Sequence, residues 1–326
     1  MYLLCPDAYE RMVRIMNYRI FSVSLPGEKY SKKGFPCQDS SGCIEKNGIK
    51  IVVVADGHGS NDCFRSEVGS RLAVECLINS ALPLLKYKDG TFSETGIKNF
   101  KYSFWMSWRN AVKQDWETRA PNDQEVRFKY ISEKYKERYF SSDSTIQERY
   151  LYNAYGTTML CAIAIENQIL LLQIGDGTCI VLQKNGLFTT PVPKDDDNFL
   201  NVTTSLCEQD ADTKIRHAVL DCSLRHPNCP VAVFLSSDGL DDCFANCKNE
   251  EHLFKFYKVI IDAIANDGFI SVNQEIIEDV LPKMSANGSR DDISLGYLIM
   301  NKLVLLKHTL KKIKLPQSGD EENDDN

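Results

Sequence analysis

IVVVADGHG, residues 51–59, joins an apolar run to an abrupt polar turn. The five apolar residues are mostly β-branched and predict a buried strand over 49–55. Asp56 then offers a hard oxygen ligand beside two glycines, which also allow a backbone carbonyl to turn toward a cation. His58 adds a side chain that titrates near neutral pH. A plain polar turn after a core strand would look the same, so other segments must distinguish the two interpretations.

Three further segments place aspartates beside an apolar run that predicts a strand. These are 169–174 before Gly175-Asp176-Gly177, 231–235 before Ser236-Ser237-Asp238-Gly239-Leu240-Asp241-Asp242, and Ser289-Arg290-Asp291-Asp292 before 293–298. A single aspartate beside a strand is usually a turn former or a cap, but four such clusters indicate carboxylates that converge. Converging carboxylates raise one another's pKa unless a cation neutralises them. No zinc-type Cys/His spacing accompanies them, so the pattern favours magnesium or manganese.

The chain resembles the metal-dependent serine/threonine protein phosphatases of type 2C, and most closely their single-domain bacterial branch. The matching stretches occur in the family's order over roughly residues 20–300: Gln38-Asp39, Asp56-Gly57-His58-Gly59, Gly156-Thr157-Thr158, Gly175-Asp176-Gly177, Ser237-Asp238-Gly239-Leu240 with Asp242, and Ser289-Arg290-Asp291-Asp292. Each stretch is weak alone, and together they are specific. The resemblance implies an α+β fold: a four-layer α/β/β/α sandwich of two antiparallel sheets flanked by helices.

The resemblance also implies a centre of two manganese or magnesium ions at one edge of the sandwich, with a third ion in bacterial members. By position, the implied ligands of the first metal are Asp56, Asp238 and Asp291, and those of the third are Asp176 and Asp242. Asp56 and the Gly57 carbonyl would hold the second metal. Asp39 matches an acid that hydrogen-bonds metal-bound water, and His58 matches the histidine that protonates the leaving group. A water shared by two such ions would attack the phosphorus of a phosphoserine or phosphothreonine in a protein substrate.

The chain departs from the family pattern in two places. Gln38 stands where the family has glutamate; an amide can ligate a metal but brings no charge, so we expect weaker occupancy of the second metal. Gly34 stands where the family has a phosphate-clamping arginine. Lys32 and Lys33 are the candidate replacements, although an ammonium lacks arginine's bidentate fork. A solvated lysine pair in a loop is an equally good interpretation.

Two other functions remain open from the sequence. Gln38 and the missing arginine fit a catalytically weak or inactive module that binds partners, but an inactive site has no need of so many mutually repelling acids. A small-molecule phosphoesterase is the second alternative, although the chain has no phosphate-cradling glycine loop and no basic groove for a nucleotide.

Composition indicates an ordinary globular protein. The 326 residues are 43% hydrophobic and 25% charged, and the formal net charge is -7. Five acids in the last seven residues account for most of that charge: Asp320, Glu321, Glu322, Asp324 and Asp325. The remainder is near neutral, so no field favours nucleic acid or a membrane surface. No apolar run reaches bilayer length, and the start lacks a secretion signal. The 12 cysteines are scattered, many in apolar segments, which predicts buried free thiols and a cytoplasmic location.

The rest of the chain is expected to form one domain, residues 1–315, followed by a disordered acidic tail, 316–326. Apolar periodicity predicts helices over 65–82, 97–118 and, as two helices, 250–285, with Ser271 as a cap. Residues 156–190 read as an antiparallel meander that places Asp176 between two paired strands, and the final strands are expected to run to about Leu306. The charged stretch 119–150 predicts a helical insertion, either a solvated helix or a regulatory surface. Asp195, Asp196 and Asp197 read as an acidic loop.

Overall fold

Two five-stranded antiparallel sheets form the centre of the molecule. The computed structural model describes residues 17–83, 91–122, 125, 127–195, 203–244 and 249–315. The first sheet has the order β1 (Tyr18–Leu25), β10 (Ile293–Met300), β9 (Pro230–Ser236), β6 (Thr178–Gln183) and β7 (Phe188–Thr189). The second has the order β2 (Ser40–Lys46), β3 (Ile49–Ala55), β4 (Met159–Ile165), β5 (Gln168–Ile174) and β8 (Arg216–Asp221).

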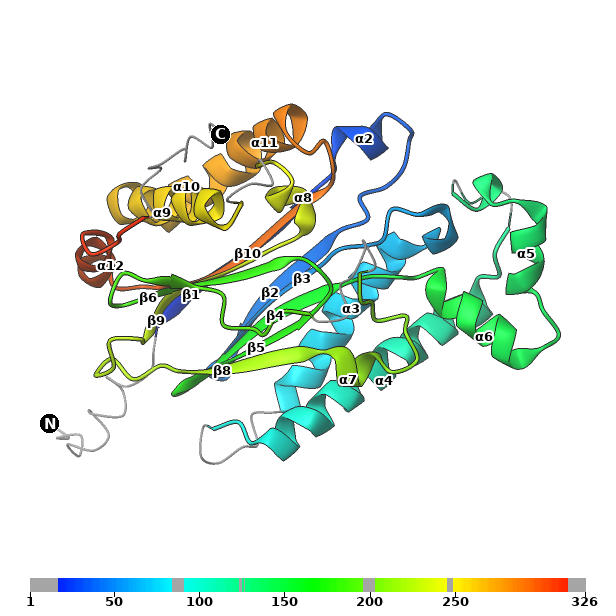
Figure 1. Cartoon of the computed structure of the whole chain (residues 1–326), viewed down its shortest axis with the longest axis horizontal. Helices are drawn as coiled ribbons and strands as arrows, with labels where there is room; N and C mark the ends of the chain where they lie inside the picture. The colour runs from blue at the N-terminus through cyan, green and yellow to red at the C-terminus, as the bar shows by residue number, and fades with distance from the viewer. Residues whose placement is uncertain are drawn as a thin grey trace, which may run out of the picture.

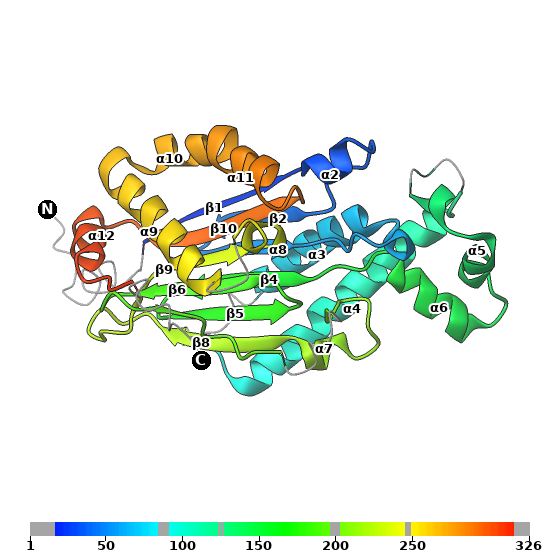
Figure 2. The same cartoon turned by 45° about the horizontal axis from the view of Figure 1, so that its top comes forward.

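Helices cover the outer face of each sheet, which makes four layers (Figures 1 and 2). The helices α3 (Ser66–Ala81) and α4 (Glu94–Thr118) pack against the second sheet. On the first sheet lie α9 (Asn249–Asp267), α10 (Phe269–Glu275), one π turn (Ile276–Val280), α11 (Leu281–Asn287) and α12 (Leu303–Leu310). The predicted α/β/β/α sandwich is confirmed.

Strand β3 shows why its sequence is apolar without interruption. Val52 and Val54 belong to the core between the two sheets, whereas Ile51 and Val53 pack in the core beneath the helices. All four are fully buried. Successive side chains of a strand point to opposite faces, so a strand covered on both faces needs apolar residues at every position. The strand is therefore held rigidly up to its end at Asp56.

The charged stretch after α4 folds into short helices at one end of the molecule (Figure 1). A 3₁₀ turn (Phe128–Tyr130), α5 (Glu133–Tyr139) and α6 (Ser144–Asn153) follow one another. The predicted helical content is present, but the stretch is more than a solvated surface. Phe128 and Tyr139 are buried, and their rings lie 4.8 and 5.3 Å from the ring of Phe64, just before α3.

Several sequence expectations were wrong in detail. β5 and β6 do not pair: β5 pairs with β4 and β8, while β6 pairs with β7 and β9 in the other sheet. Asp176 therefore lies where the chain crosses between sheets, not inside a meander. The strand expected to reach Leu306 ends at Met300, and α12 follows. Ser271 lies inside α10, whose N-cap is Gly268. The edge strands β2 and β8 were not predicted.

The expected acidic tail 316–326, Asp196 and Asp197 lie outside the described residues. Asp195 is described: it accepts a hydrogen bond from the Thr204 hydroxyl at 2.6 Å and lies 3.6 Å from Arg216. The cysteines Cys76, Cys161 and Cys179 are buried free thiols, as expected. Within the described part of the chain, no helix combines the length and the apolar character needed to cross a bilayer.

Candidate active site

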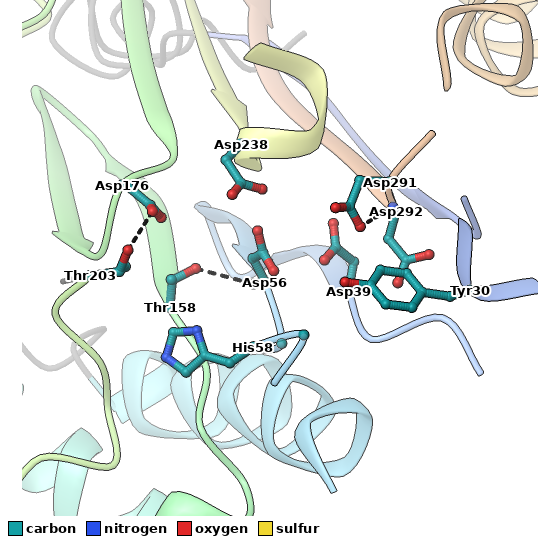
Figure 3. A pocket seen from close by; sticks show the side chains of 12 residues that line it. Tyr30, Asp39, Asp56, His58, Thr158, Asp176, Thr203, Asp238, Asp291 and Asp292 are labelled. Atoms are coloured by element: carbon teal, nitrogen blue, oxygen red, sulfur yellow. Dashed lines mark hydrogen bonds between the residues drawn. The ribbon is translucent and has the colours of Figure 1, made fainter. Parts of the chain in front are cut away.

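A pocket opens at the edge of the sandwich where strands of both sheets end (Figure 3). Its acidic residues come from the loop before β2, the end of β3, the β5–β6 crossover, the start of α8 (Asp238–Asp241) and the start of β10. Six of the lining residues are aspartates: Asp39, Asp56, Asp176, Asp238, Asp291 and Asp292. The other lining residues are Tyr30, Gly57, His58, Gly59, Thr158 and Thr203. Aspartates far apart in sequence thus converge, as predicted.

The backbone of Asp56 is clamped by the start of β4. The Asp56 amide donates to the Thr158 hydroxyl at 3.2 Å, and the Asp56 carbonyl accepts from the Thr158 amide and the Thr157 hydroxyl, each at 2.8 Å. These bonds continue the β3–β4 pairing past the end of the strand. They fix the direction in which the Asp56 carboxylate enters the pocket.

Asp292 ties the loop before β2 to the start of β10. Its carboxylate accepts from the Gly27 amide and the Gln38 amide, each at 2.7 Å. Gly27 has to be glycine, because a Cβ there would lie 2.2 Å from the backbone carbon of Asp291. This close approach brings Asp39 and Asp291, from opposite ends of the sequence, to the same side of the pocket.

Burial, with mutual repulsion added to it, raises the pKa values of the carboxylates. Burial, and then the charge of Asp292, raise the pKa of Asp39 to about 7. Burial raises the pKa of Asp56 well above its usual range, with Asp39 and Asp238 adding to the effect, and Asp56 and Asp238 are close enough to share a hydrogen bond. Burial also raises the pKa of Asp238. A group of acids that resist ionising together is the electrostatic signature of a site built for cations.

The donor chemistry fits hard divalent ions. All the ligand candidates in the pocket are carboxylate or carbonyl oxygens, the donors that magnesium and manganese prefer. In addition, Oδ2 of Asp39 is buried with no hydrogen-bond partner among the described residues. Across that same part of the chain, no three His, Cys, Asp or Glu side chains are arranged as a preformed coordination shell. The pocket therefore offers suitable donors without a fixed ion geometry.

His58 lies at the rim of the pocket below Asp56 (Figure 3). The His58 amide donates to the Gly156 carbonyl at 3.1 Å. A Cβ on residue 156 would lie 2.6 Å from Cδ2 of the His58 imidazole, so the glycine leaves room for the ring. Burial lowers the pKa of His58, which keeps the imidazole neutral over more of the physiological range.

Four of the residues singled out from the sequence do not line the pocket. The Gln38 side chain turns away, with Oε1 accepting from the Ser66 hydroxyl at 3.4 Å. Asp242 is exposed beside the pocket; burial, and then the charges of Asp291 and Asp176, raise its pKa. Lys32 pairs with Glu28, and neither Lys32 nor Lys33 reaches the pocket.

Lys29 is a cation that does reach the site, and sequence reasoning missed it. Its Nζ lies 3.1 Å from Oδ2 of Asp291 and 4.8 Å from the centre of the Tyr30 ring. Lys29 and Tyr30 both belong to the short helix α2 (Glu28–Ser31). Asp292 was part of a recognised stretch, but the sequence assigned it no role. Thr203 belongs to no recognised motif, yet the Thr203 hydroxyl donates to Asp176 at 2.6 Å.

The model of the protein phosphatase 2C family matches residues 26–281 of this chain. A search of curated proteins finds no match. Among solved structures, the catalytic domain of the serine/threonine protein phosphatase PstP, in complex with two manganese ions, is similar at a TM-score of 0.51 and 14% identity, covering 87% of this chain and 99% of that one. The structure of PstP from Mycobacterium tuberculosis has a TM-score of 0.50 and 13% identity, and the match covers 87% of this chain and 99% of that one.

Two further solved structures are similar to a comparable degree. PppA, a regulatory component of T6SS in Pseudomonas aeruginosa, has a TM-score of 0.51 and 16% identity over 88% of this chain and 99% of that one. A sex-determining protein of C. elegans has a TM-score of 0.50 and 16% identity, and the match covers 91% of this chain and 68% of that one. At these identities the structural likeness shows the fold, and the family model, which covers most of the chain, shows the relationship. The chain belongs to the protein phosphatase 2C family.

Proposed function

We propose that this protein is a metal-dependent phosphatase that hydrolyses phosphoserine and phosphothreonine in protein substrates. The observation that carries the proposal is the convergence of Asp39, Asp56, Asp176, Asp238 and Asp291 in one pocket beside His58. Membership of the phosphatase 2C family supports the reaction class. That PstP was crystallised with two manganese ions supports the cofactor.

Asp56 is the central ligand in this proposal, because it lies within hydrogen-bonding reach of Asp238. Asp56, Asp238, Asp291 and the Gly57 carbonyl would hold two manganese or magnesium ions, and Asp176 with Asp242 would hold a third. When bound, such ions lower the pKa of a coordinated water and neutralise charge on the phosphoryl oxygens. Gln38 is not proposed as a direct ligand, since its amide faces Ser66.

Asp39 and His58 would move the protons. Asp39 lines the pocket, so its carboxylate would accept a hydrogen bond from the attacking water. Burial makes the imidazolium form of His58 a minority near neutral pH, and this protonated form would give its proton to the departing serine or threonine oxygen, which is a poor leaving group as an alkoxide. Proton donation of this kind contributes typically about 10²–10⁴-fold to the rate.

The test is hydrolysis of p-nitrophenyl phosphate and of a phosphoserine peptide by the full chain, with and without manganese. We expect metal-dependent turnover of both substrates by the wild type and a loss of at least about 100-fold in Asp238→Asn, since this variant removes a ligand charge. Asp262→Asn, an exposed change on α9, is the matched control and should retain activity.

Two outcomes contradict the proposal. No turnover with any metal would indicate an inactive module with a phosphatase fold. Turnover of the aryl phosphate but of no phosphopeptide would indicate a small-molecule phosphoesterase.

A further inference from the structure

Arg127 is a buried arginine in the helical stretch after α4, and the residue is only 2% exposed. Burying a guanidinium is costly unless its charge and its donors are satisfied. Among the described residues no carboxylate pairs with Arg127. Its two Nη groups donate instead to the segment that carries His58 and to the start of α3, while the buried Nε has no partner among those residues.

The contacts of Arg127 converge on one turn. Nη2 donates to the His58 carbonyl at 3.1 Å and also to the Ser60 carbonyl. Nη1 donates to the hydroxyl of Ser66, the first residue of α3, at 2.7 Å. The planar guanidinium therefore fixes both ends of the turn 58–60 relative to α3, which a single-point ammonium cannot do.

Residues on both sides of Arg127 are anchored to the N-terminal end of the same helix. Glu125 accepts two hydrogen bonds from Arg65, which directly precedes α3, at 2.6 and 2.8 Å. The Phe128 ring packs 4.8 Å from the Phe64 ring. These contacts of its neighbours hold the chain on both sides of Arg127 close to the start of α3.

We propose that Arg127 is a positioning residue for His58. Since the His58 amide is already held by the Gly156 carbonyl, Arg127 supplies the second anchor at the other end of the same residue. The inference rests on the proposed function only in the role given to His58. The inference also assigns a structural role to the charged stretch after α4, because that stretch contains Arg127 and places it next to the turn.

The role of His58 predicts a dependence on the leaving group. Serine alkoxide needs a proton from His58 in order to leave, whereas p-nitrophenolate does not. A small displacement of a catalytic group costs up to about 100-fold. Arg127→Met should therefore lower kcat for a phosphoserine peptide by about 10-fold or more, and kcat for p-nitrophenyl phosphate by no more than about 3-fold. KM should stay constant, because Arg127 does not line the pocket.

Amide hydrogen exchange in segment 57–64 of the full chain gives a readout that needs no activity. We expect faster exchange there in Arg127→Met than in the wild type. Arg138→Met is the matched control: Arg138 hydrogen-bonds the Tyr150 hydroxyl at 2.7 Å and lies over the Tyr135 ring, all within the same stretch of short helices. This control should change neither the exchange in segment 57–64 nor the ratio of the two activities. If Arg127→Met does not fold, Arg127→Lys, which keeps the charge but replaces the planar fork by a single ammonium nitrogen, should shift both readouts less but in the same direction.

The outcomes separate this inference from the proposed function. If His58→Gln lowers the ratio of peptide to aryl phosphate turnover and Arg127→Met leaves both this ratio and the exchange unchanged, the inference alone is overturned. An equal loss on both substrates in Arg127→Met would also overturn it, because it would show a general effect on the site. If His58→Gln leaves the ratio unchanged, the proposed role of His58 fails, and the inference fails with it.

Discussion

Asp241, a buried carboxylate next to the acidic pocket, offers a quantitative test of the electrostatics there, because its ionisation opposes folding. The residue lies in α8, and its carboxylate accepts from the Ser236 hydroxyl at 3.2 Å and from the Thr178 hydroxyl. Burial raises the pKa of Asp241 from 3.8 to about 7. Asp241→Asn removes the ionisation and keeps both contacts, since a serine or threonine hydroxyl can donate or accept.

The sign and size of the effect follow from linkage. The folded state holds the Asp241 proton more tightly than the unfolded state, so the contribution of Asp241 to the free energy of unfolding is fully present below pH 3.8 and is lost as pH rises toward 7. A difference of about three pKa units amounts to about 4 kcal/mol, at roughly 1.36 kcal/mol per unit. About 1.6 kcal/mol of this is already lost at pH 5, at the same cost per pKa unit. The stability gained by Asp241→Asn should therefore grow by about 2 to 3 kcal/mol between pH 5 and pH 8.

The assay is urea unfolding of the metal-free protein in EDTA at both pH values, followed by tryptophan fluorescence. Asp262→Asn, which changes an exposed carboxylate, should show no such growth. A difference between wild type and Asp241→Asn that is the same at pH 5 and pH 8 would refute the reasoning, as would a loss of stability in the variant at pH 8.

Three more predictions test the site and its support. In a thermal shift assay, manganese should raise the Tm of the wild type but not that of Asp56→Asn, because a ligand stabilises only the state that binds it. Gly156→Ala should cost about 1–3 kcal/mol in urea unfolding and lower phosphopeptide turnover, since its Cβ would overlap the His58 ring. Arg65→Met should lower the free energy of unfolding by about 3–5 kcal/mol, because it leaves the mostly buried Glu125 carboxylate without its partner; an unchanged urea midpoint would contradict this.

Local sequence signals were sufficient for most of the site. Asp56, Asp176, Asp238 and Asp291 were recognisable because each borders a run of apolar residues, and a run of that kind predicts where a buried strand ends. The same local signals did not predict whether each strand pairs with its neighbour in the sequence. The turn at Asp176 looked like a hairpin, but β5 and β6 join different sheets. Partner choice depends on contacts between distant residues, and no local pattern encodes it.

The edge strand β2 and the contact of Arg127 with His58 were likewise not predictable from local sequence patterns. The strand β2 is largely half-exposed and contains Ser40, Ser41 and Gly42, so its apolar signal is weak; the neighbouring strand supplies its backbone partners. Arg127 looked like one charge among many in a polar stretch, and only folding buries it against the His58 carbonyl. The sequence by itself determined which carboxylates stand at strand ends, since hydrophobic periodicity is local. The tertiary structure alone decided which side chains meet them, because burial and long-range hydrogen bonds exist only after the sheets have packed.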